Sequence, residues 1–283
     1  MMGARALAAK KRRRNFMPYE YRGLVLDEFQ REAIWYLENK ISTLVSAPTG
    51  TGKTLIADFL VEKTLEANQR LIYTAPIKAL VNQKYREFQR RYGRRIGIVT
   101  GDVSHQQTAP IVVMTTEILR NMLIRDDSRG TDADWIVFDE THYLNHPERG
   151  TVWEEAILFI PEDTLILGLS ATIPNAGQLA QWVGSIGRET AVVEHAERAV
   201  PLRHMYFTRH GQAVERKGLL QAVAESPPID ADTKAGTLAW HELPITPRHR
   251  TRGPQRAATH LDLIHYAAKH RLFPCLYFVF SRD

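Results

Sequence analysis

Short apolar runs rich in β-branched residues recur along the chain from about residue 26 to residue 207. They occupy residues 41–45 (ISTLV), 71–75 (LIYTA), 96–100 (IGIVT), 111–115 (IVVMT), 135–139 (WIVFD) and 164–170 (TLILGLS). Runs of this length indicate buried strands. Apolar residues spaced three or four apart indicate helices at residues 53–67, 77–92, 117–124, 152–160 and 176–184. This alternation predicts an α/β fold, with a parallel sheet covered by helices on both faces.

The pattern changes after residue 208. Residues 209–255 are rich in proline, glycine and charge, which indicates a linker or a poorly ordered insertion. Residues 256–270 then have a helical pattern, and residues 276–281 (LYFVFS) resemble a strand. We therefore expect a basic N-terminal extension (1–25), an α/β domain (26–208), the linker (209–255) and the truncated start of a second α/β domain (256–283).

Composition permits an anionic partner, because the net charge is +5. The basic run at residues 10–14 (KKRRR) is compatible with a solvated tail, a nucleic-acid-binding arm or a nuclear address. The one cysteine, Cys275, excludes an internal disulfide and is expected to be a buried apolar residue. No apolar segment has the length of a spanning helix, and the N-terminus lacks the apolar core of a secretory signal. We expect a soluble intracellular chain, in the cytoplasm or the nucleus.

The turn after the first predicted strand carries the first candidate site. Residues 47–54 (APTGTGKT) fit a phosphate-binding loop except at the first position, where Ala47 replaces glycine. Glycines let successive N–H groups turn toward a phosphate, and the following helix N-terminus attracts negative charge. Lys53 can reach the β- and γ-phosphates, and the Thr54 hydroxyl can hold Mg²⁺. An ordinary glycine-rich connection is the alternative. The predicted nucleotide-binding residues are Thr49, Gly50, Thr51, Gly52, Lys53 and Thr54.

A second candidate site follows the predicted strand at residues 135–138. Asp139 and Glu140 lie at its carboxyl end, where open α/β sheets bind ligands. Asp139 can coordinate Mg²⁺, and Glu140 can orient or deprotonate a water that attacks the γ-phosphate. Alone, such a pair is more often a charged turn. Together with the phosphate loop, it predicts an ATP–Mg²⁺ site.

His142 is harder to assign. A metal role is disfavoured, because no second His or Cys lies at ligand spacing on the same element. We expect instead a polar contact that couples the acidic loop to Ser170, Ala171 and Thr172, which end another predicted strand. The alternative for these three residues is a simple turn and helix cap before Pro174.

These motifs, in this order, resemble those of superfamily 2 helicases of the DExH type, and more narrowly the superkiller-type (Ski-like) RNA helicases. Residues 47–54, 139–142 and 170–172 resemble motifs I, II and III, and residues 26–34 (LDEFQREAI) resemble the entry segment. The more specific matches are residues 74–88 (TAPIKALVNQKYREF), 100–103 (TGDV), 113–123 (VMTTEILRNML) and 146–161 (HPERGTVWEEAILFIP). Residues 272–282 resemble the first strand of the family's second domain.

The resemblance implies that residues 26–208 form a RecA-like P-loop ATPase domain of an ATP-dependent RNA helicase. It implies ATP and Mg²⁺ as cofactors, an adenine contact for Gln30, and a catalytic set of Lys53, Asp139, Glu140 and His142. It also implies a track for single-stranded nucleic acid along Pro76, Lys78, Gly101, Asp102, Thr115, Thr116 and Glu117. Contacts of this kind to phosphates carry no base information, so binding is expected to be independent of sequence and sensitive to salt.

Two other functions fit the same motifs: a DNA helicase of the same superfamily, and a non-enzymatic nucleotide-dependent module that binds nucleic acid. The family's later motifs, including an arginine that neutralises the transition state, lie in its second domain. We therefore expect these 283 residues to bind ATP–Mg²⁺ weakly, to hydrolyse it slowly and to leave duplexes unwound. No membrane partner is expected, and an RNA-processing complex is a possible partner.

Overall fold

The computed structural model describes residues 20–145, 150–172, 175–198, 200–201, 204–207, 213–215, 217 and 260–272. The chain divides into two compact units, unit 1 at Met1–Val200 and unit 2 at Pro201–Asp283. In unit 2, β11 (Tyr206–Phe207) pairs with β12 (Ala213–Val214), and α10 (His260–Lys269) agrees with the predicted helix. Cys275, the predicted strand at 276–281 and the basic run at 10–14 lie outside the described residues.

Unit 1 is built on an eight-stranded sheet with the order β10–β3–β9–β8–β4–β7–β5–β6. All neighbouring strands are parallel except β6, which is antiparallel to β5. The strands are β3 (Ser42–Ser46), β4 (Leu71–Ala75), β5 (Ile96–Val99), β6 (Ser104–His105), β7 (Ile111–Thr115), β8 (Trp135–Phe138), β9 (Leu165–Ser170) and β10 (Thr190–Glu194). The predicted parallel sheet is confirmed, with one antiparallel edge strand added.

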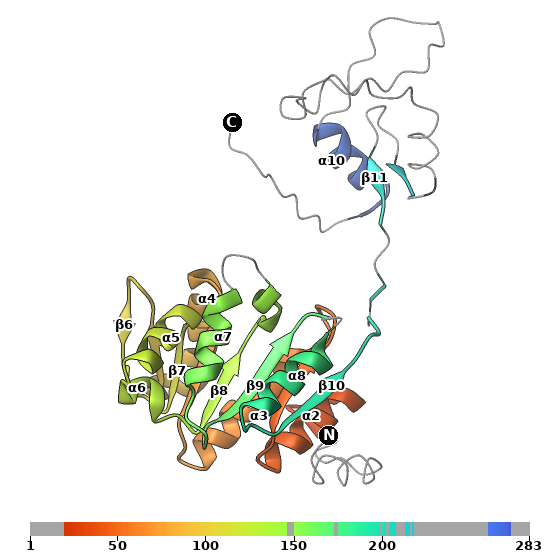
Figure 1. Cartoon of the computed structure of the whole chain (residues 1–283). Helices are drawn as coiled ribbons and strands as arrows, with labels where there is room; N and C mark the ends of the chain where they lie inside the picture. The colour runs from red at the N-terminus through yellow and green to blue at the C-terminus, as the bar shows by residue number, and fades with distance from the viewer. Residues whose placement is uncertain are drawn as a thin grey trace, which may run out of the picture. The chain divides into compact units, whose positions relative to one another are not determined.

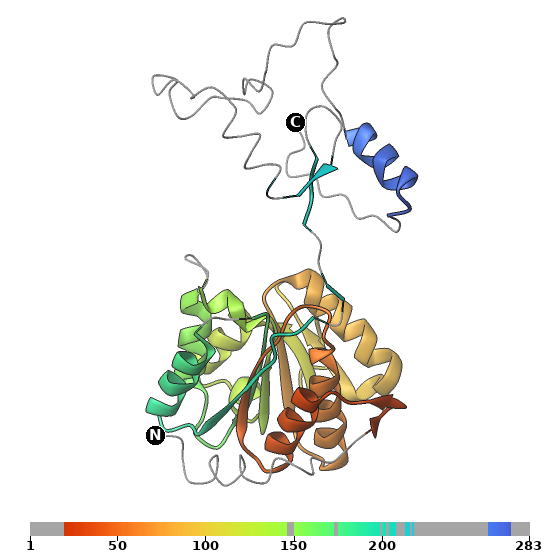
Figure 2. The ribbon, with the colours of Figure 1, turned by 90° about the vertical axis from the view of Figure 1, so that its right-hand side faces the viewer.

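Helices cover both faces of this sheet (Figures 1 and 2). One face carries α2 (Glu28–Glu38), α3 (Lys53–Glu66) and α4 (Lys78–Tyr92). The other carries α5 (Thr116–Ile124), α7 (Gly150–Phe159) and α8 (Ala176–Ser185), with the short α6 (Ser128–Thr131) beside α5. Two 3-10 helices, η1 (Gly93–Arg95) and η2 (Thr141–Asn145), follow α4 and β8. The predicted α/β architecture is therefore present with its helices on both faces.

Helix α3 is buried more completely than its sequence pattern predicts. We expected one buried face, but six consecutive residues, 56–61, are buried. The N-terminal hairpin of β1 (Glu20–Tyr21) and β2 (Leu24–Val25) accounts for part of this difference. The ring of Tyr21 packs on Phe59 with centroids 5.5 Å apart, and Arg22 donates to the buried Asp58 carboxylate at 2.8 Å. Tertiary contacts thus cover the side that would otherwise face water.

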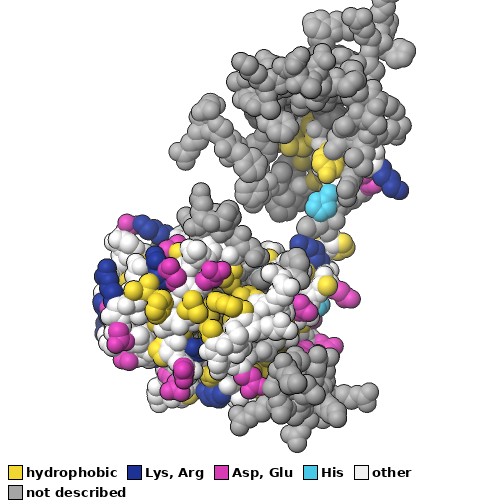
Figure 3. All heavy atoms as spheres, in the orientation of Figure 1, with side chains coloured by type: hydrophobic (Ala, Val, Ile, Leu, Met, Phe, Trp, Pro, Cys, Tyr) yellow, Lys and Arg dark blue, Asp and Glu magenta, His cyan; other side chains and the backbone are white. Residues whose placement is uncertain are grey.

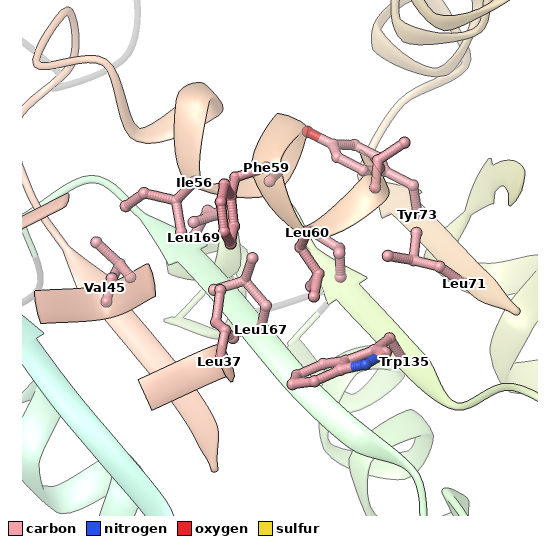
Figure 4. Packing of buried hydrophobic residues seen from close by; sticks show 14 of the residues in the cluster. Leu37, Val45, Ile56, Phe59, Leu60, Leu71, Tyr73, Trp135, Leu167 and Leu169 are labelled. Atoms are coloured by element: carbon pink, nitrogen blue, oxygen red, sulfur yellow. The ribbon is translucent and has the colours of Figure 1, made fainter. Parts of the chain in front are cut away.

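The larger hydrophobic core lies between α2, α3, α4 and the sheet. Figure 4 shows Phe59 and Leu60 of α3 close to Leu167 and Trp135 on the strands. Below α4, the rings of Tyr73 and Phe88 are fully buried and meet edge to face, with centroids 5.5 Å apart. These contacts fix α3 and α4 on the sheet, and the loops that precede both helices lie at its carboxyl edge.

The helices on the opposite face expose some apolar side chains to solvent. Leu158 and Phe159 of α7 are about half exposed, and Figure 3 shows hydrophobic side chains gathered on this face. None of the described helices is long and apolar enough to cross a membrane.

Phe88→Ala tests the packing of α4 on the sheet. We expect the free energy of unfolding to fall by about 3–5 kcal/mol, because a close-packed core collapses only partly around the cavity. Urea denaturation measures the change. The control is Leu158→Ala, at a position that is 53% exposed, and it should change stability by about 0.5 kcal/mol or less. Equal effects of the two substitutions would contradict the packing described for Phe88.

Candidate nucleotide site and nucleic-acid track

The carboxyl ends of three adjacent strands bring the predicted nucleotide-binding segments together. Strand β9 lies between β3 and β8, with Ser46 opposite Ser170 and Phe138 opposite Gly168. The phosphate loop leaves β3, and the acidic loop leaves β8. Both loops contact the end of β9, since Ala47 N donates to Ser170 O at 3.2 Å and the Thr141 hydroxyl lies 3.2 Å from Leu169 O.

The phosphate loop has the backbone that its glycines predict. Gly50 and Gly52 have φ of 86° and 80°, in the left-handed region that favours glycine. The Thr51 hydroxyl donates to Pro48 O at 2.8 Å and closes the turn. Gly52 is the N-cap of α3, and no side chain caps this helix end. The first N–H groups of α3 are therefore available to an anion.

Lys53 lies folded over this loop. Its Nζ donates to Ala47 O at 2.6 Å and to Pro48 O at 2.9 Å. Burial lowers the pKa of Lys53, while the charges of Glu140 and Asp139 act in the opposite direction and raise it. The ammonium group is thus close enough to both carboxylates to interact with them electrostatically. A site that binds a triphosphate together with its metal ion requires these groups to be close.

The acidic pair is held by its neighbours. Asp139 Oδ2 accepts a 2.6 Å hydrogen bond from the buried Tyr73 hydroxyl, and Asp139 Oδ1 accepts one from Glu140 N at 3.0 Å. Burial and the charge of Asp139 raise the pKa of Glu140, against the opposing influence of His142 and Lys53. Glu140 Oε2 lies 3.2 Å from His142 Nδ1. A carboxylate with a raised pKa is suited to accept a proton near neutral pH.

Thr141, which the sequence reasoning did not select, links the acidic loop to β9. Its buried hydroxyl lies 2.9 Å from Phe138 O and 3.2 Å from Leu169 O. Over the described residues, no hydrogen bond joins His142 to residues 170–172, so its coupling role stays a prediction. The Ser170 hydroxyl is buried without a hydrogen-bond partner in the described part of the chain. Ala171 and Thr172 follow it at the carboxyl edge of the sheet.

Gln30 is buried against the phosphate loop. Its Oε1 accepts from Asp27 N at 2.9 Å, which completes a capping box at the start of α2. Its Nε2 donates to Gly52 O at 3.1 Å and lies 3.3 Å from Thr51 O. The structure thus gives Gln30 a role in holding the loop, and the adenine contact stays a prediction.

Arg198 is a cation beside the phosphate loop that the sequence did not single out. Strand β10 pairs with β3, with Glu194 opposite Ser46, and His195 N donates to Ser46 O at 2.9 Å. The chain then brings Arg198 Nη1 to 3.5 Å from Thr49 O. No sequence signal was available, because the position of Arg198 depends on an edge strand that the hydrophobic pattern did not predict.

Thr54 and Asp139 fit a site for Mg²⁺ that is held mainly by phosphates. Thr54 is exposed in the first turn of α3, and Asp139 directly follows β8, the strand next to β9. Within the described ranges, no group of three His, Cys, Asp or Glu residues could hold a metal. Mg²⁺ usually takes one or two protein carboxylates plus substrate phosphates and water, so this donor set is sufficient.

The predicted nucleic-acid track lies on the same edge of the sheet. Its three segments follow β4, β5 and β7, which are neighbours, with Ala75 opposite Thr115 and Val99 opposite Met114. The exposed Lys78 and Asp102 form an ion pair at 2.6 Å across two of these segments. The structure brings together Pro76, Lys78, Gly101, Asp102, Thr115, Thr116 and Glu117.

Individual track residues differ in exposure. Thr116 is fully buried, so its side chain faces the interior, and Thr115 is the N-cap of α5. Lys78 is exposed, and Gly101 lies close to it, since a Cβ at Gly101 would be 3.3 Å from Lys78 Nζ. A single strand of nucleic acid on this edge would therefore contact Lys78, Gly101 and the amino end of α5, and would not reach the buried hydroxyl of Thr116.

Comparison with known proteins defines the class of this domain. Residues 27–179 match the family model described as DEAD/DEAH box helicase. Because the match covers more than half of the 283 residues, the chain belongs to the DEAD/DEAH box helicase family. This confirms the helicase superfamily that the motifs resemble.

The relatives are RNA helicases and related proteins. "mRNA transport homolog 4" of Caenorhabditis elegans is 39% identical over 94% of this chain and 26% of its own length. Human "Exosome RNA helicase MTR4" is 45% identical over 67% of this chain and 18% of its own length. Human "Superkiller complex protein 2" is 36% identical over 90% of this chain and 21% of its own length. These matches agree with the Ski-like resemblance, and the chain spans about a quarter or less of each relative.

Substitutions at the two loop glycines should separate backbone strain from a side-chain contact. Alanine at either position is strained by roughly 1–2 kcal/mol, because both have left-handed φ. A Cβ at Gly52 would also lie 2.7 Å from Gln30 Nε2, whereas at Gly50 nothing lies within 4 Å. In urea denaturation, we expect Gly52→Ala to destabilise the chain more than Gly50→Ala.

A double substitution gives the control for this contact. Gln30→Ala should remove the additional cost of Gly52→Ala, so the two effects should be non-additive. Additive effects would show that Gln30 and Gly52 do not interact.

Stability should depend on pH through Glu140. Because its folded-state pKa is raised, the unfolded chain loses this proton first as the pH rises. The free energy of unfolding therefore falls as the pH rises from the ordinary glutamate pKa of about 4.3 through the raised value. Glu140→Gln has no carboxyl group at this position, so it does not lose stability in this way as the pH rises. Its melting temperature should exceed that of the wild type at neutral pH, and the difference should vanish well below about pH 4.

The matched control is Glu154→Gln, at an exposed position of α7. It should show no comparable pH-dependent gain. Thermal melts of the three proteins across this pH range measure the change in melting temperature. A melting temperature of Glu140→Gln below that of the wild type at pH 7 would contradict the predicted role of Glu140.

Proposed function

We propose that this chain is the ATP-binding motor domain of a DExH-type RNA helicase, which couples ATP hydrolysis to movement along single-stranded RNA. The observation that carries the proposal is that the phosphate loop and the acidic loop meet at the end of β9, where burial lowers the pKa of Lys53 and the charges of Glu140 and Asp139 act to raise it. The alternative, a glycine-rich turn beside an unrelated acidic turn, would not require this arrangement.

The residues of the pocket have distinct roles in the proposed reaction. Lys53 exchanges its hydrogen bonds to Ala47 O and Pro48 O for bonds to the β- and γ-phosphates. The free N–H groups at the start of α3 bind the same phosphates, and Arg198 adds a cation beside the loop. Glu140 orients the attacking water and accepts its proton. Bound Mg²⁺, held by Thr54 and Asp139, would neutralise charge on the phosphate oxygens.

RNA is the proposed substrate because the relatives include a protein named as an RNA helicase. The track offers backbone N–H groups and a lysine rather than base-reading side chains, which suits a single strand of any sequence. The names "Exosome" and "Superkiller complex" also support an RNA-processing complex as the partner of the full-length protein. Tighter binding of oligo(U) than of oligo(dT) of equal length would separate this proposal from a DNA helicase.

Nucleotide titration of the 283-residue chain tests the site directly. Lys53→Ala removes charge-assisted hydrogen bonds worth about 1.5–3 kcal/mol each, so ATP–Mg²⁺ should bind at least roughly 10–150-fold more weakly, the loss expected from a single such bond. Isothermal titration calorimetry measures the affinity. The control is Lys63→Ala, which removes the same charge from an exposed position near the other end of α3 and should bind as the wild type does. Equal affinities for all three proteins would exclude the proposed site.

A further inference from the structure

A basic cleft lies at the β5–β6 edge of the sheet, apart from the nucleotide site. It has a volume of ≈ 510 Å³ and is lined by Gln89, Gly93, Arg94, His105 and Gln106. The end of α4, the turn η1 and strand β6 supply these residues. The lining contains no acidic residue and no large apolar side chain, so the cleft offers only polar and cationic groups.

The surroundings of this cleft are strongly cationic. Residues 86–95 contain five arginines and one glutamate. Arg91 is paired with Asp58 and with Glu87, so the glutamate is already engaged. The remaining arginines are exposed, and none of them forms an ion pair with another described residue; they are Arg86, Arg90, Arg94 and Arg95. Dark blue side chains also mark this edge of unit 1 (Figures 1 and 3).

The dipole of helix α4 explains only part of this positive charge. Cations in the last turn of a helix interact favourably with its dipole, which accounts for Arg90 and Arg91 in α4. Arg94 and Arg95 lie beyond that helix, in η1. Adjacent like charges repel each other, and a bound anion would relieve that repulsion.

The floor of the cleft is a fixed structure. Gln106 O packs so closely on Gly97 that a Cβ there would lie 2.0 Å away. The Gln106 side-chain amide is oriented so that its nitrogen faces two backbone carbonyls. It donates to Ile96 O at 2.9 Å and to Arg94 O at 3.1 Å. The backbone that carries Arg94 is therefore tied to the edge strand.

We propose that this cleft binds phosphates of the same single-stranded RNA that crosses the track, and so extends the track around the sheet edge. Gly101 and Asp102 lie beyond the carboxyl end of β5, and Arg94 lies beyond its amino end. Seven residues lead from Arg94 to Gly101, so at ~3.3 Å per residue the two are at most about 23 Å apart, a distance that several nucleotides span. This inference rests on the proposed function.

The chemistry of the lining favours RNA over an acidic protein. Guanidinium groups bind phosphate oxygens through paired hydrogen bonds, and the neighbouring glutamine and histidine side chains add polar contacts. Protein interfaces are usually anchored by aromatic or other apolar side chains, and no such side chain lines this cleft.

The test compares a charge reversal in the cleft with a matched reversal elsewhere. Arg94→Glu alters the cleft, whereas Arg125→Glu makes the same change of charge at the exposed end of α5. Oligo(U) binding is measured by fluorescence anisotropy on the full 283-residue chain, with a short oligomer and a series of longer ones, at several salt concentrations. Thermal melts check that both variants remain folded.

The wild type and Arg125→Glu should gain affinity as the oligomer lengthens. Arg94→Glu should bind the short oligomer as they do, and should bind the long oligomers about tenfold more weakly. The slope of its salt dependence on long RNA should also become shallower, by about 0.7 for each phosphate that the cleft no longer binds.

Three results would overturn the inference. Equal losses in Arg94→Glu and Arg125→Glu would indicate a general effect of net charge, and full long-RNA affinity in Arg94→Glu would show that the cleft is not used. In that second case, loss of polyglutamate binding in Arg94→Glu would assign the cleft to an acidic protein. Failure of the wild type to bind even the short oligomer would instead exclude the RNA track, and the cleft proposal with it.

Discussion

The candidate site depends on the parallel pairing of β3, β9 and β8. The register places Ser46 beside Ser170 and Phe138 beside Gly168, so the loops that follow β3 and β8 start within two residues of each other along β9. A shift of one strand by a single residue would exchange the side chains of its two buried faces, and the close packing of helices on both faces resists that exchange. The phosphate loop and the acidic loop are consequently held on either side of the end of β9.

Within this frame, the site is already organised by internal hydrogen bonds. Lys53 is held by two loop carbonyls, Gln30 fastens the loop to α2, and Tyr73 orients the Asp139 carboxylate. Groups that are already ordered lose less conformational entropy when a ligand binds. Phosphates that enter the pocket would therefore exchange partners with Lys53 instead of ordering a loose loop.

Support for the phosphate loop extends well beyond the motifs. Asp58 lies on α3, the helix that begins at Lys53, and its buried carboxylate accepts hydrogen bonds from Arg22 at 2.8 Å and Arg91 at 2.6 Å. These arginines come from the N-terminal hairpin and from α4. Because removal of one partner from a buried ion pair is costly, this arrangement fixes α3 between two other elements. The helix that begins at the phosphate loop is thereby anchored from its outer side.

The sequence by itself determined the elements whose signal is local. Short β-branched runs predicted β3, β4, β5, β7, β8 and β9, since each is buried on both faces and therefore has few charged or strongly polar residues. Glycines in residues 47–54 and the carboxylates at 139–140 identified the two loops, because left-handed turns and metal ligands restrict the residue types that can serve. Their order supplied the helicase family, which the family match confirms.

Only the tertiary structure decided features that depend on which elements become neighbours. Strand β6 has two exposed residues and β10 has alternating burial, so neither has the apolar run of a central strand. The contacts of Gln30, Thr141 and Arg198 join residues from 21 to 149 positions apart, and no local pattern encodes such distances. A residue type records the chemistry that a position can perform, whereas the packing of helices on the sheet selects the partner that it meets.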